Sequence, residues 1–481
     1  MKVALIGGGG PRTIYFTESL LKYSKRLGIT ELCLMDNDDR KLSAFGGICR
    51  ALANDFAKNN NNPVTVTLEN DFRRAVCGTK AVVFAIRAGG DDARVNDEKI
   101  ALSFGLIGQE TTGAGGFAYA MRTIPVMIEY LRILHETAPE AIAFNFTNPA
   151  GLVTQALCDA GFKNIYGICD NATGIKIELS KVLGISSADL KVNAYGLNHL
   201  SWVNAVRLGG TNILPELLSS QAFIDNFKLF AYFDRDIIKY LGEIPNGYLF
   251  YYYHREKALA NMLKSPKTRG ESIRDINRIM LEELSVLDVE KNPDTALEIF
   301  RRRMEEREGS YMKMEMDGLK KHAGLDPASY NFNFIDRKTD ESGRNPAGGP
   351  LPVPEAIEGY AGVAFNCMES LWHSGKSIDV ALNLPNNGAI EGMESDDVVE
   401  VSCDVDETGV KPLQFTGIPH SNFLLMKTIK RYEKLAIKAI RERRREYAYE
   451  ALTIHPLVSS YSLAKCLVDK YCEANNARDW K

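Results

Sequence analysis

Near its start the chain contains Val3-Ala4-Leu5-Ile6-Gly7-Gly8-Gly9-Gly10, an apolar run that passes directly into four glycines. This pattern is typical of the first strand of a parallel sheet, followed by a tight turn and a helix. Glycines in such a turn let the backbone approach a pyrophosphate, whose charge meets the helix N-terminus. The third glycine of the usual G-x-G-x-x-G pattern is absent, because Arg12 or Thr13 stands there. The glycine run alone is therefore weak evidence for a dinucleotide site.

Asp36 strengthens this interpretation, because it ends the next apolar run, Leu34-Met35-Asp36-Asn37. A carboxylate at that place can accept hydrogen bonds from both ribose hydroxyls and would repel a 2′-phosphate, which favours NAD over NADP. The alternative is a glycine turn before a helix, with Asp36 as a helix cap. We predict an NAD site formed by Gly7, Gly8, Gly9, Gly10 and Asp36.

Up to about residue 196, short apolar strand candidates alternate with helical patterns. The strands are expected near 2–6, 32–35, 64–68, 81–86, 142–146 and 165–169, and the helices near 13–26, 39–58, 117–137, 149–160 and 174–184. This alternation predicts an α/β protein with an N-terminal Rossmann-like, doubly wound parallel sheet. Ligands of such sheets gather beyond the carboxyl ends of the strands.

From about residue 197 the alternation stops and long helical patterns dominate. They lie near 270–310, 356–373, 419–450 and 456–474, with short strand candidates near 378–384 and 398–403. We therefore expect two domains: an NAD-binding domain over 1–196, and a mixed α+β domain over 197–481 that binds substrate and forms oligomers. The segment 323–354 is rich in Gly, Pro, Asn and Asp, which predicts a long surface loop.

The composition excludes several classes of partner. The 481 residues carry 58 Lys and Arg against 62 Asp and Glu, a net charge of −4, so no nucleic-acid or membrane partner is expected. No apolar run approaches the ~20 residues of a membrane span. The first residues already form a strand candidate, which leaves no room for a signal peptide. Nine scattered cysteines are typical of reduced thiols, so we expect a cytoplasmic protein.

Cys169 and His199 are the candidate metal ligands. Each is expected near a strand end, and a thiolate and an imidazole can together bind one divalent ion. Taken singly, Cys169 is better explained by a buried apolar role, and His199 could be a core histidine, but together, near the same sheet edge and beside Asn198, they favour a ligand pair. Asp170 either lies beside such a metal or caps the helix after Asn171. Tyr248 begins an aromatic run that suits core packing, although a phenol beside a cation can act as a base.

At these residues the chain resembles glycoside hydrolase family 4, whose members are NAD- and divalent-metal-dependent glycosidases. The resemblance spans nearly the whole length, in several separate blocks that follow one another in the right order. These blocks are Gly7–Gly10, Ile86-Arg87-Ala88-Gly89-Gly90, Gly108-Gln109-Glu110-Thr111, Asn145-Phe146-Thr147-Asn148-Pro149-Ala150, Cys169-Asp170, Gly196-Leu197-Asn198-His199, Pro245-Asn246-Gly247-Tyr248, Thr268-Arg269 and Asn386-Asn387-Gly388-Ala389-Ile390.

The resemblance implies a role for each candidate residue. Cys169 and His199 would hold Mn²⁺ or a similar ion, which also binds the 2- and 3-oxygens of the sugar. Tyr248 matches the catalytic base, and Asp170 the acid of the α-acting phosphoglucosidases. The substrate-binding positions are Asn148 and the two arginines that bind a sugar 6-phosphate, Arg94 and Arg269.

The implied mechanism is an elimination. NAD⁺ removes hydride from C3, the new ketone acidifies the proton at C2, and Tyr248 takes that proton while the metal stabilises the enediolate. The C1–O bond then breaks while Asp170 protonates the leaving oxygen, water adds to the unsaturated sugar, and NADH returns the hydride. NAD-dependent glycosidases are thus an exception to the usual scheme with two carboxylates.

Three departures from the family pattern bear on specificity. Many phosphosugar members carry Ser where Gly10 stands, and α-phosphoglucosidases usually have Met-Pro where this chain has Asn171-Ala172. β-Specific members usually have Asn directly after the cysteine, so Asp170 favours the α anomer. The segment 323–354 is an expected insertion relative to other members.

The leading hypothesis is a 6-phospho-α-glucosidase that acts on a small phosphorylated disaccharide or glycoside and assembles as a homodimer or homotetramer. The alternatives within the family are a 6-phospho-β-glucosidase and an α-glycosidase for unphosphorylated sugars. Outside the family, an NAD-dependent hydroxy-acid dehydrogenase would share the glycine turn and Asp36, but would not need Cys169, His199 and Tyr248 together. A redox-sensing NAD-binding protein without catalysis is a further alternative.

Overall fold

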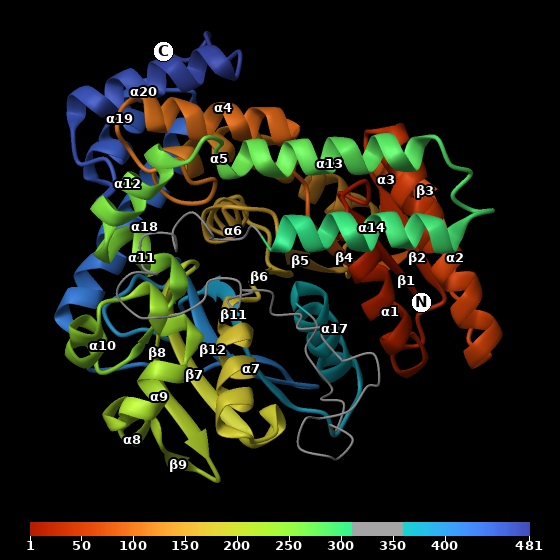
Figure 1. Cartoon of the computed structure of the whole chain (residues 1–481), viewed down its shortest axis with the longest axis horizontal. Helices are drawn as coiled ribbons and strands as arrows, with labels where there is room; N and C mark the ends of the chain where they lie inside the picture. Colours follow the sequence, from red (N-terminus) through yellow and green to blue (C-terminus); the bar gives the residue numbers. More distant parts are fainter. Residues whose placement is uncertain (310–358) are drawn as a thin grey trace.

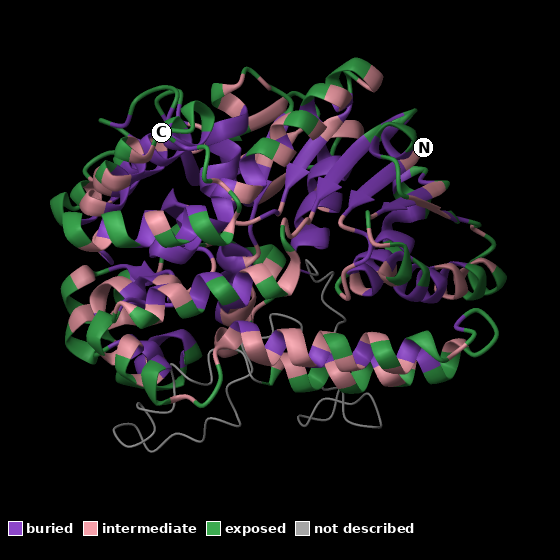
Figure 2. Cartoon of the chain, turned by 90° about the horizontal axis from the view of Figure 1, so that it is seen from above, coloured by how far each residue is buried: buried purple, intermediate pink, exposed green. Residues whose placement is uncertain are grey.

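A computed structural model describes residues 1–309 and 359–481. In these ranges thirteen strands form one mixed sheet with helices on both faces (Figure 1). The main strand order is β10-β8-β7-β12-β11-β6-β5-β4-β1-β2-β3. Figure 2 shows the buried strands lying between helices whose outer faces are exposed. No helix within the described ranges is both long enough and apolar enough to cross a membrane.

One half of the sheet is parallel and confirms the Rossmann-like prediction. Its strands pair in the order β3-β2-β1-β4-β5-β6, which is the order of a dinucleotide-binding sheet. The six strands are β1 (Lys2–Ile6), β2 (Glu31–Met35), β3 (Thr65–Glu69), β4 (Thr79–Phe84), β5 (Ile142–Asn145) and β6 (Ile165–Ile168). The strand order reverses between β1 and β4, and a ligand crevice is expected beyond the carboxyl ends of the strands at that point.

The helices of this half cover both faces of the sheet. They are α1 (Thr13–Leu27), α2 (Asp39–Asn60), α3 (Phe72–Val76), α4 (Gly90–Ser103), α5 (Gly113–Thr137), α6 (Ala150–Asp159) and α7 (Asn171–Leu183). Helix α4 was not predicted. Its buried face includes the charged residues Arg94, Asp97 and Glu98, so it lacks the apolar periodicity by which a helix is recognised.

The other half of the sheet is antiparallel and continues the first without a break. Strand β11 (Ile378–Pro385) pairs with β6 through Leu382 and Asn383. Beyond it lie β12 (Val398–Asp406), β7 (Leu190–Leu197), β8 (Leu200–Leu208) and β10 (Ile244–Pro245), with β9 (Thr211–Asn212) and β13 (Gly409–Pro412) at the side. The boundary expected at residues 196/197 falls inside β7, and the division into two domains stays a prediction.

Several expectations for the second half need correction. The pattern over 270–310 is two helices lying side by side, α13 (Arg269–Ser285) and α14 (Pro293–Glu308), because Pro293 starts a new helix (Figure 1). The pattern over 419–450 is divided into two helices at Arg443, whose backbone is in the left-handed conformation. The β7–β8 hairpin was not predicted. The segment 323–354 lies outside the described residues.

The remaining helices complete the second half around the antiparallel strands. Those before α13 are α8 (Leu214–Ser219), α9 (Gln221–Asn226), α10 (Arg235–Leu241), α11 (Phe250–Tyr253) and α12 (Arg255–Lys264). Those after α14 are α17 (Gly359–Trp372), α18 (His420–Glu442), α19 (Arg445–Ile454) and α20 (Tyr461–Ala474). Helices α13, α14 and α17 contribute residues to the cavity described next.

Candidate active site

A cavity of about 740 Å³ lies beyond the carboxyl ends of the parallel strands, where the strand order predicts a ligand crevice. Eleven of the twelve predicted site residues line it: Gly7, Gly9, Gly10, Asp36, Arg94, Asn148, Cys169, Asp170, His199, Tyr248 and Arg269. The exception is Gly8, which packs against β2, where a Cβ atom would lie 2.9 Å from the Cβ of Leu34. Segments far apart in the sequence therefore meet at one site.

The turn after β1 leaves no room for a Cβ atom at Gly7 and Gly9 either. Gly7 has a φ of +97°, and a Cβ atom there would lie 2.4 Å from the carbonyl oxygen of Ala85, just beyond β4. A Cβ atom on Gly9 would lie 2.8 Å from the carboxylate of Asp36. Larger residues would thus push the turn away from both neighbouring strands.

Asp36 connects this turn to the segment that follows β2. Its Oδ2 accepts a hydrogen bond from the Gly9 amide at 2.9 Å, and its Oδ1 accepts one from the Asp38 amide at 3.1 Å. Asp38, and not Asp36, caps helix α2 by accepting from the Lys41 amide at 3.0 Å. The cap interpretation of Asp36 is therefore wrong. Burial raises the pKa of Asp36, and the two amides oppose that shift.

Cys169 and His199 come together at the edge of the cavity. Cys169 directly follows β6, and His199 sits in the turn between β7 and β8 with a φ of +62°. The Cys169 Sγ lies 3.6 Å from the His199 Nε2. Two ligand atoms at about 2.3 and 2.1 Å from one ion, at a near-tetrahedral angle, would be about 3.6 Å apart. The pair thus has the spacing of two ligands of one metal.

The protonation preferences of this pair follow from burial. Burial lowers the pKa of His199 to about 4, so its imidazole is neutral, as a metal ligand must be. Burial also raises the pKa of Cys169, and the charges of Glu400 and Asp170 add to the shift. The described residues contain no group of three or more His, Cys, Asp or Glu side chains suited to a metal. An ion bound here would keep coordination positions for other ligands.

Tyr248 lies directly against the imidazole. Its ring stacks on that of His199 with 3.7 Å between centroids and 6° between planes. The Asn246 side chain fixes the local backbone, because its Oδ1 accepts from the Tyr248 amide at 3.0 Å and its Nδ2 donates to Ser201 Oγ at 3.1 Å. The phenol of Tyr248 is thereby held beside the Cys169–His199 pair.

Asp170 occupies the N-cap position of α7, but its side chain makes no capping hydrogen bond. The cap interpretation is therefore wrong for the carboxyl group, which lines the cavity instead. Burial raises the pKa of Asp170, and Arg12 opposes the shift. A carboxyl group that keeps its proton to higher pH is suited to donate that proton.

A chain of ion pairs surrounds the predicted phosphate-binding arginines. Arg94 donates to Glu98 Oε1 at 2.8 Å, and its Nη1 lies 3.1 Å from Glu110 Oε2. The other oxygen of Glu98 accepts from the Gly270 amide at 2.7 Å, which ties α4 to the start of α13 next to Arg269. Although burial opposes them, Arg87 and Arg94 lower the pKa of Glu110 to about 2.

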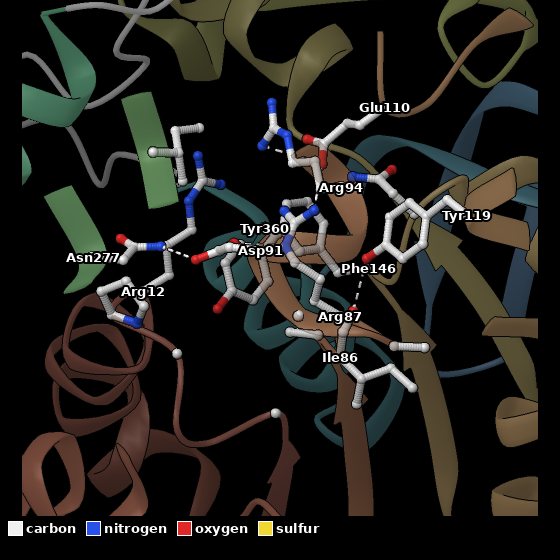
Figure 3. A pocket seen from close by; sticks show the side chains of 18 of the residues that line it. Arg12, Ile86, Arg87, Asp91, Arg94, Glu110, Tyr119, Phe146, Asn277 and Tyr360 are labelled. Atoms are coloured by element: carbon white, nitrogen blue, oxygen red, sulfur yellow. Dashed lines mark hydrogen bonds and ion pairs between the residues drawn. The ribbon is translucent and has the colours of Figure 1, made fainter. Parts of the chain in front are cut away.

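The sequence did not identify every polar residue of the cavity. Arg12, Arg87, Glu110, Asn277 and Arg307 also line it, and no role was assigned to them. Figure 3 shows Arg12 and Asn277 across the cavity from Glu110, with the Asn277 Nδ2 donating to Asp91 Oδ2 at 2.7 Å. Burial and the charge of Arg12 lower the pKa of Arg307 to about 9. Arg87 and Glu110 belong to the sequence blocks that resemble the family. By contrast, nothing in the sequence indicates that Arg307, on α14, would face the cavity.

Two family models match the chain. The model described as family 4 glycosyl hydrolase matches residues 2–185, and its C-terminal domain model matches residues 194–458. A "probable 6-phospho-beta-glucosidase" of Bacillus subtilis is 29% identical over 99% of this chain and 97% of its own. A maltose-6′-phosphate glucosidase of Clostridium acetobutylicum is 26% identical over 98% of this chain and 97% of its own.

A solved structure supports the same assignment. The 6-phospho-β-glucosidase of Thermotoga maritima with manganese, NAD⁺ and glucose-6-phosphate superposes with a TM-score of 0.76 and 26% identity, covering 100% of this chain and 99% of that chain. The matched family models together extend over both halves of the sheet. The chain belongs to glycosyl hydrolase family 4.

Proposed function

We propose that this glycoside hydrolase cleaves a 6-phospho-glucoside, with the α anomer favoured, using NAD and a divalent metal such as Mn²⁺. The observation that carries the proposal is the 3.6 Å approach of Cys169 Sγ to His199 Nε2 in the cavity that the glycine turn also lines. The two relatives, which match over nearly their whole length, are named as a probable 6-phospho-β-glucosidase and a maltose-6′-phosphate glucosidase, and both names describe phosphorylated glucosides. This supports the proposed substrate class.

The residues that line the cavity fit both NAD and a divalent metal ion. Gly7, Gly9 and Gly10 line the cavity without side chains, so a pyrophosphate can approach their backbone, and the half-buried carboxylate of Asp36 suits a ribose diol without a 2′-phosphate. Cys169 and His199 supply a thiol and a neutral imidazole at the spacing of two metal ligands. When bound, NAD⁺ would accept hydride from C3 of the sugar and the metal would polarise the neighbouring oxygens, which acidifies the C2 proton.

Side chains of the protein carry out the proton transfers and bind the substrate. Tyr248, stacked on the imidazole, takes the proton from C2. Asp170, whose pKa is raised by burial, protonates the glycosidic oxygen as the C1–O bond breaks. The sugar and its phosphate are held by Asn148, Arg94 and Arg269.

One observation supports the α anomer, and another supports the β anomer. The half-buried carboxyl of Asp170 makes no capping hydrogen bond and is available as a proton donor, which supports the α anomer. Relatives named as β-acting enzymes are 28–29% identical to this chain, and those named as α-acting or maltose-6′-phosphate enzymes are 25–26% identical. A 6-phospho-β-glucosidase is therefore the second candidate.

Turnover of matched chromogenic substrates tests the proposal. The protein is assayed with 4-nitrophenyl α- and β-glucosides, each with and without a 6-phosphate, in the presence or absence of NAD⁺ and Mn²⁺. We expect fastest release from the α-6-phosphate, and only with both cofactors. Faster release from the β-6-phosphate would select the second candidate. NADH formed in stoichiometric amount would indicate a dehydrogenase, and no turnover of any glycoside would contradict the proposal.

Arg269→Ala is expected to raise KM for the phosphorylated glucoside by about 10–100-fold, the worth of hydrogen bonds to a charged group. The substitution is expected to leave kcat and the KM for the unphosphorylated glucoside nearly unchanged. Arg274→Ala on the same helix is the matched control, because Arg274 pairs with Asp275 and Asp92. Equal effects of Arg269→Ala on both substrates would show that Arg269 does not bind the phosphate.

We further propose that the enzyme is cytoplasmic and forms a homodimer or homotetramer. All nine cysteines are free thiols, which supports a reducing compartment. The assembly follows from the family resemblance, and light scattering of the purified protein measures it directly.

A further inference from the structure

The loop between α4 and α5 places the Thr111 hydroxyl between the Gln109 side chain and the imidazole of His199. The Thr111 Oγ1 lies 2.9 Å from the Gln109 Oε1 and 3.2 Å from the His199 Nδ1. Both Thr111 and His199 are buried. The three side chains therefore form a continuous hydrogen-bonded row that ends at Nδ1 of the imidazole, whereas Nε2 of the same ring faces Cys169.

The orientation of Gln109 is fixed by the backbone. Its side-chain oxygen accepts from the Thr111 amide at 2.6 Å and from the Thr112 amide at 2.9 Å. A backbone N–H can only donate, so the atom that faces these two amides must be the oxygen and not the nitrogen of the carboxamide. This carboxamide oxygen can only accept, so the Thr111 hydroxyl donates its hydrogen to it.

The position of the imidazole hydrogen follows from this order. A hydroxyl carries one hydrogen, and that of Thr111 is used on Gln109, so Oγ1 faces His199 Nδ1 as an acceptor. The Nδ1 atom must then carry the N–H. A neutral imidazole has only one N–H, so Nε2 keeps its lone pair, and Nε2 is the atom 3.6 Å from Cys169 Sγ.

We propose that Gln109 and Thr111 form a relay that fixes His199 in its Nδ1–H tautomer and so reserves Nε2 for the metal. The relay rests on the proposed metal dependence, and both residues act as positioning residues. The stack on Tyr248 fixes the plane of the ring, whereas the relay determines which nitrogen bears the hydrogen. Partners of this kind typically change metal affinity by about 10–100-fold when they are removed.

Three threonine variants test the relay through metal binding alone. Thr111→Val keeps the shape but removes the acceptor, and we expect it to weaken Mn²⁺ binding by about 10–100-fold, measured by electron paramagnetic resonance of free Mn²⁺. Thr111→Ser restores the hydroxyl and is expected to recover most of the affinity. Thr112→Val is the matched control, since that hydroxyl lies 2.8 Å from the Tyr252 hydroxyl and not near His199. Unchanged affinity in Thr111→Val would overturn the relay.

A second measurement reads the tautomer without any metal. The metal-free protein is labelled with ¹⁵N-histidine, and the His199 signals are identified by their loss in His199→Gln. We expect the Nδ1–H tautomer in the unsubstituted protein and in Thr112→Val, and a gain of the Nε2–H form in Thr111→Val. An Nε2–H tautomer in the unsubstituted protein would contradict the relay. If the protein binds no Mn²⁺ at all, the proposed function is wrong. These spectra still show which nitrogen of His199 bears the hydrogen, and so they test the relay independently.

Discussion

Tyr248→Phe is expected to lower kcat by about 10²–10⁴-fold, the usual worth of a general base. The phenylalanine ring can keep the stack on His199, so the substitution removes the hydroxyl and little else. The affinities for NAD⁺ and Mn²⁺ are therefore expected to change little. Steady-state turnover of the preferred 6-phospho-glucoside, together with direct binding of both cofactors, measures the effect.

The isotope content of the product shows which step is lost. In D₂O the unsubstituted enzyme is expected to introduce deuterium at C2 of the sugar, because the C2 proton is removed and replaced during turnover. Tyr253→Phe is the matched control from the same aromatic run, since the Tyr253 hydroxyl accepts from Trp202 Nε1 at 3.1 Å and does not line the cavity. Full activity in Tyr248→Phe would mean that another group removes the C2 proton.

Cys169→Ser is expected to weaken Mn²⁺ binding by more than about 100-fold, beyond the effect typical of an outer partner of a metal ligand. A hydroxyl is a far poorer ligand than a thiolate, since it must lose a proton of much higher pKa before it binds with comparable strength. Turnover at low Mn²⁺ is expected to fall in parallel, with partial recovery at high Mn²⁺. Titration of the metal-free protein with Mn²⁺ measures the affinity.

A second buried cysteine provides the control for this substitution. Cys403 on β12 donates to the Val401 carbonyl at 3.3 Å and lies outside the cavity, so Cys403→Ser keeps a hydrogen bond and leaves the Cys169–His199 pair untouched. We expect both serine variants to fold and only Cys169→Ser to lose Mn²⁺. Equal Mn²⁺ affinities in the two variants would show that Cys169 is not a metal ligand.

The parallel half of the sheet was the most predictable part of the fold. Strands such as β1 are buried on both faces, so they read as continuous apolar runs between helical patterns. The β7–β8 hairpin was missed because Asn198 and His199 form its turn, where the sequence signal typical of a hairpin is a pair that contains glycine. Helix α4 was missed because Arg94, Asp97 and Glu98 form part of its buried face.

The candidate site was predictable where strand ends determine position. Cys169 and Asp170 follow β6, and Asp36 follows β2, so their convergence follows from the parallel strand order. The partners that tune these residues were not predictable. Glu110 and Thr111 lie on the loop before α5, and Arg307 on α14, so their contacts depend on how those segments pack over the sheet.

The hydrogen-bonded ladder between β6 and β11 has a consequence for dissecting the enzyme. Leu382 and Asn383 pair with Ile168 and Gly167, so a fragment ending near residue 196 would leave the backbone groups of β6 exposed at a bare edge. Unprotected edges of this kind recruit other chains and lead to aggregation. The parallel half of the sheet is therefore a poor candidate for expression by itself, and studies of NAD binding need the intact polypeptide.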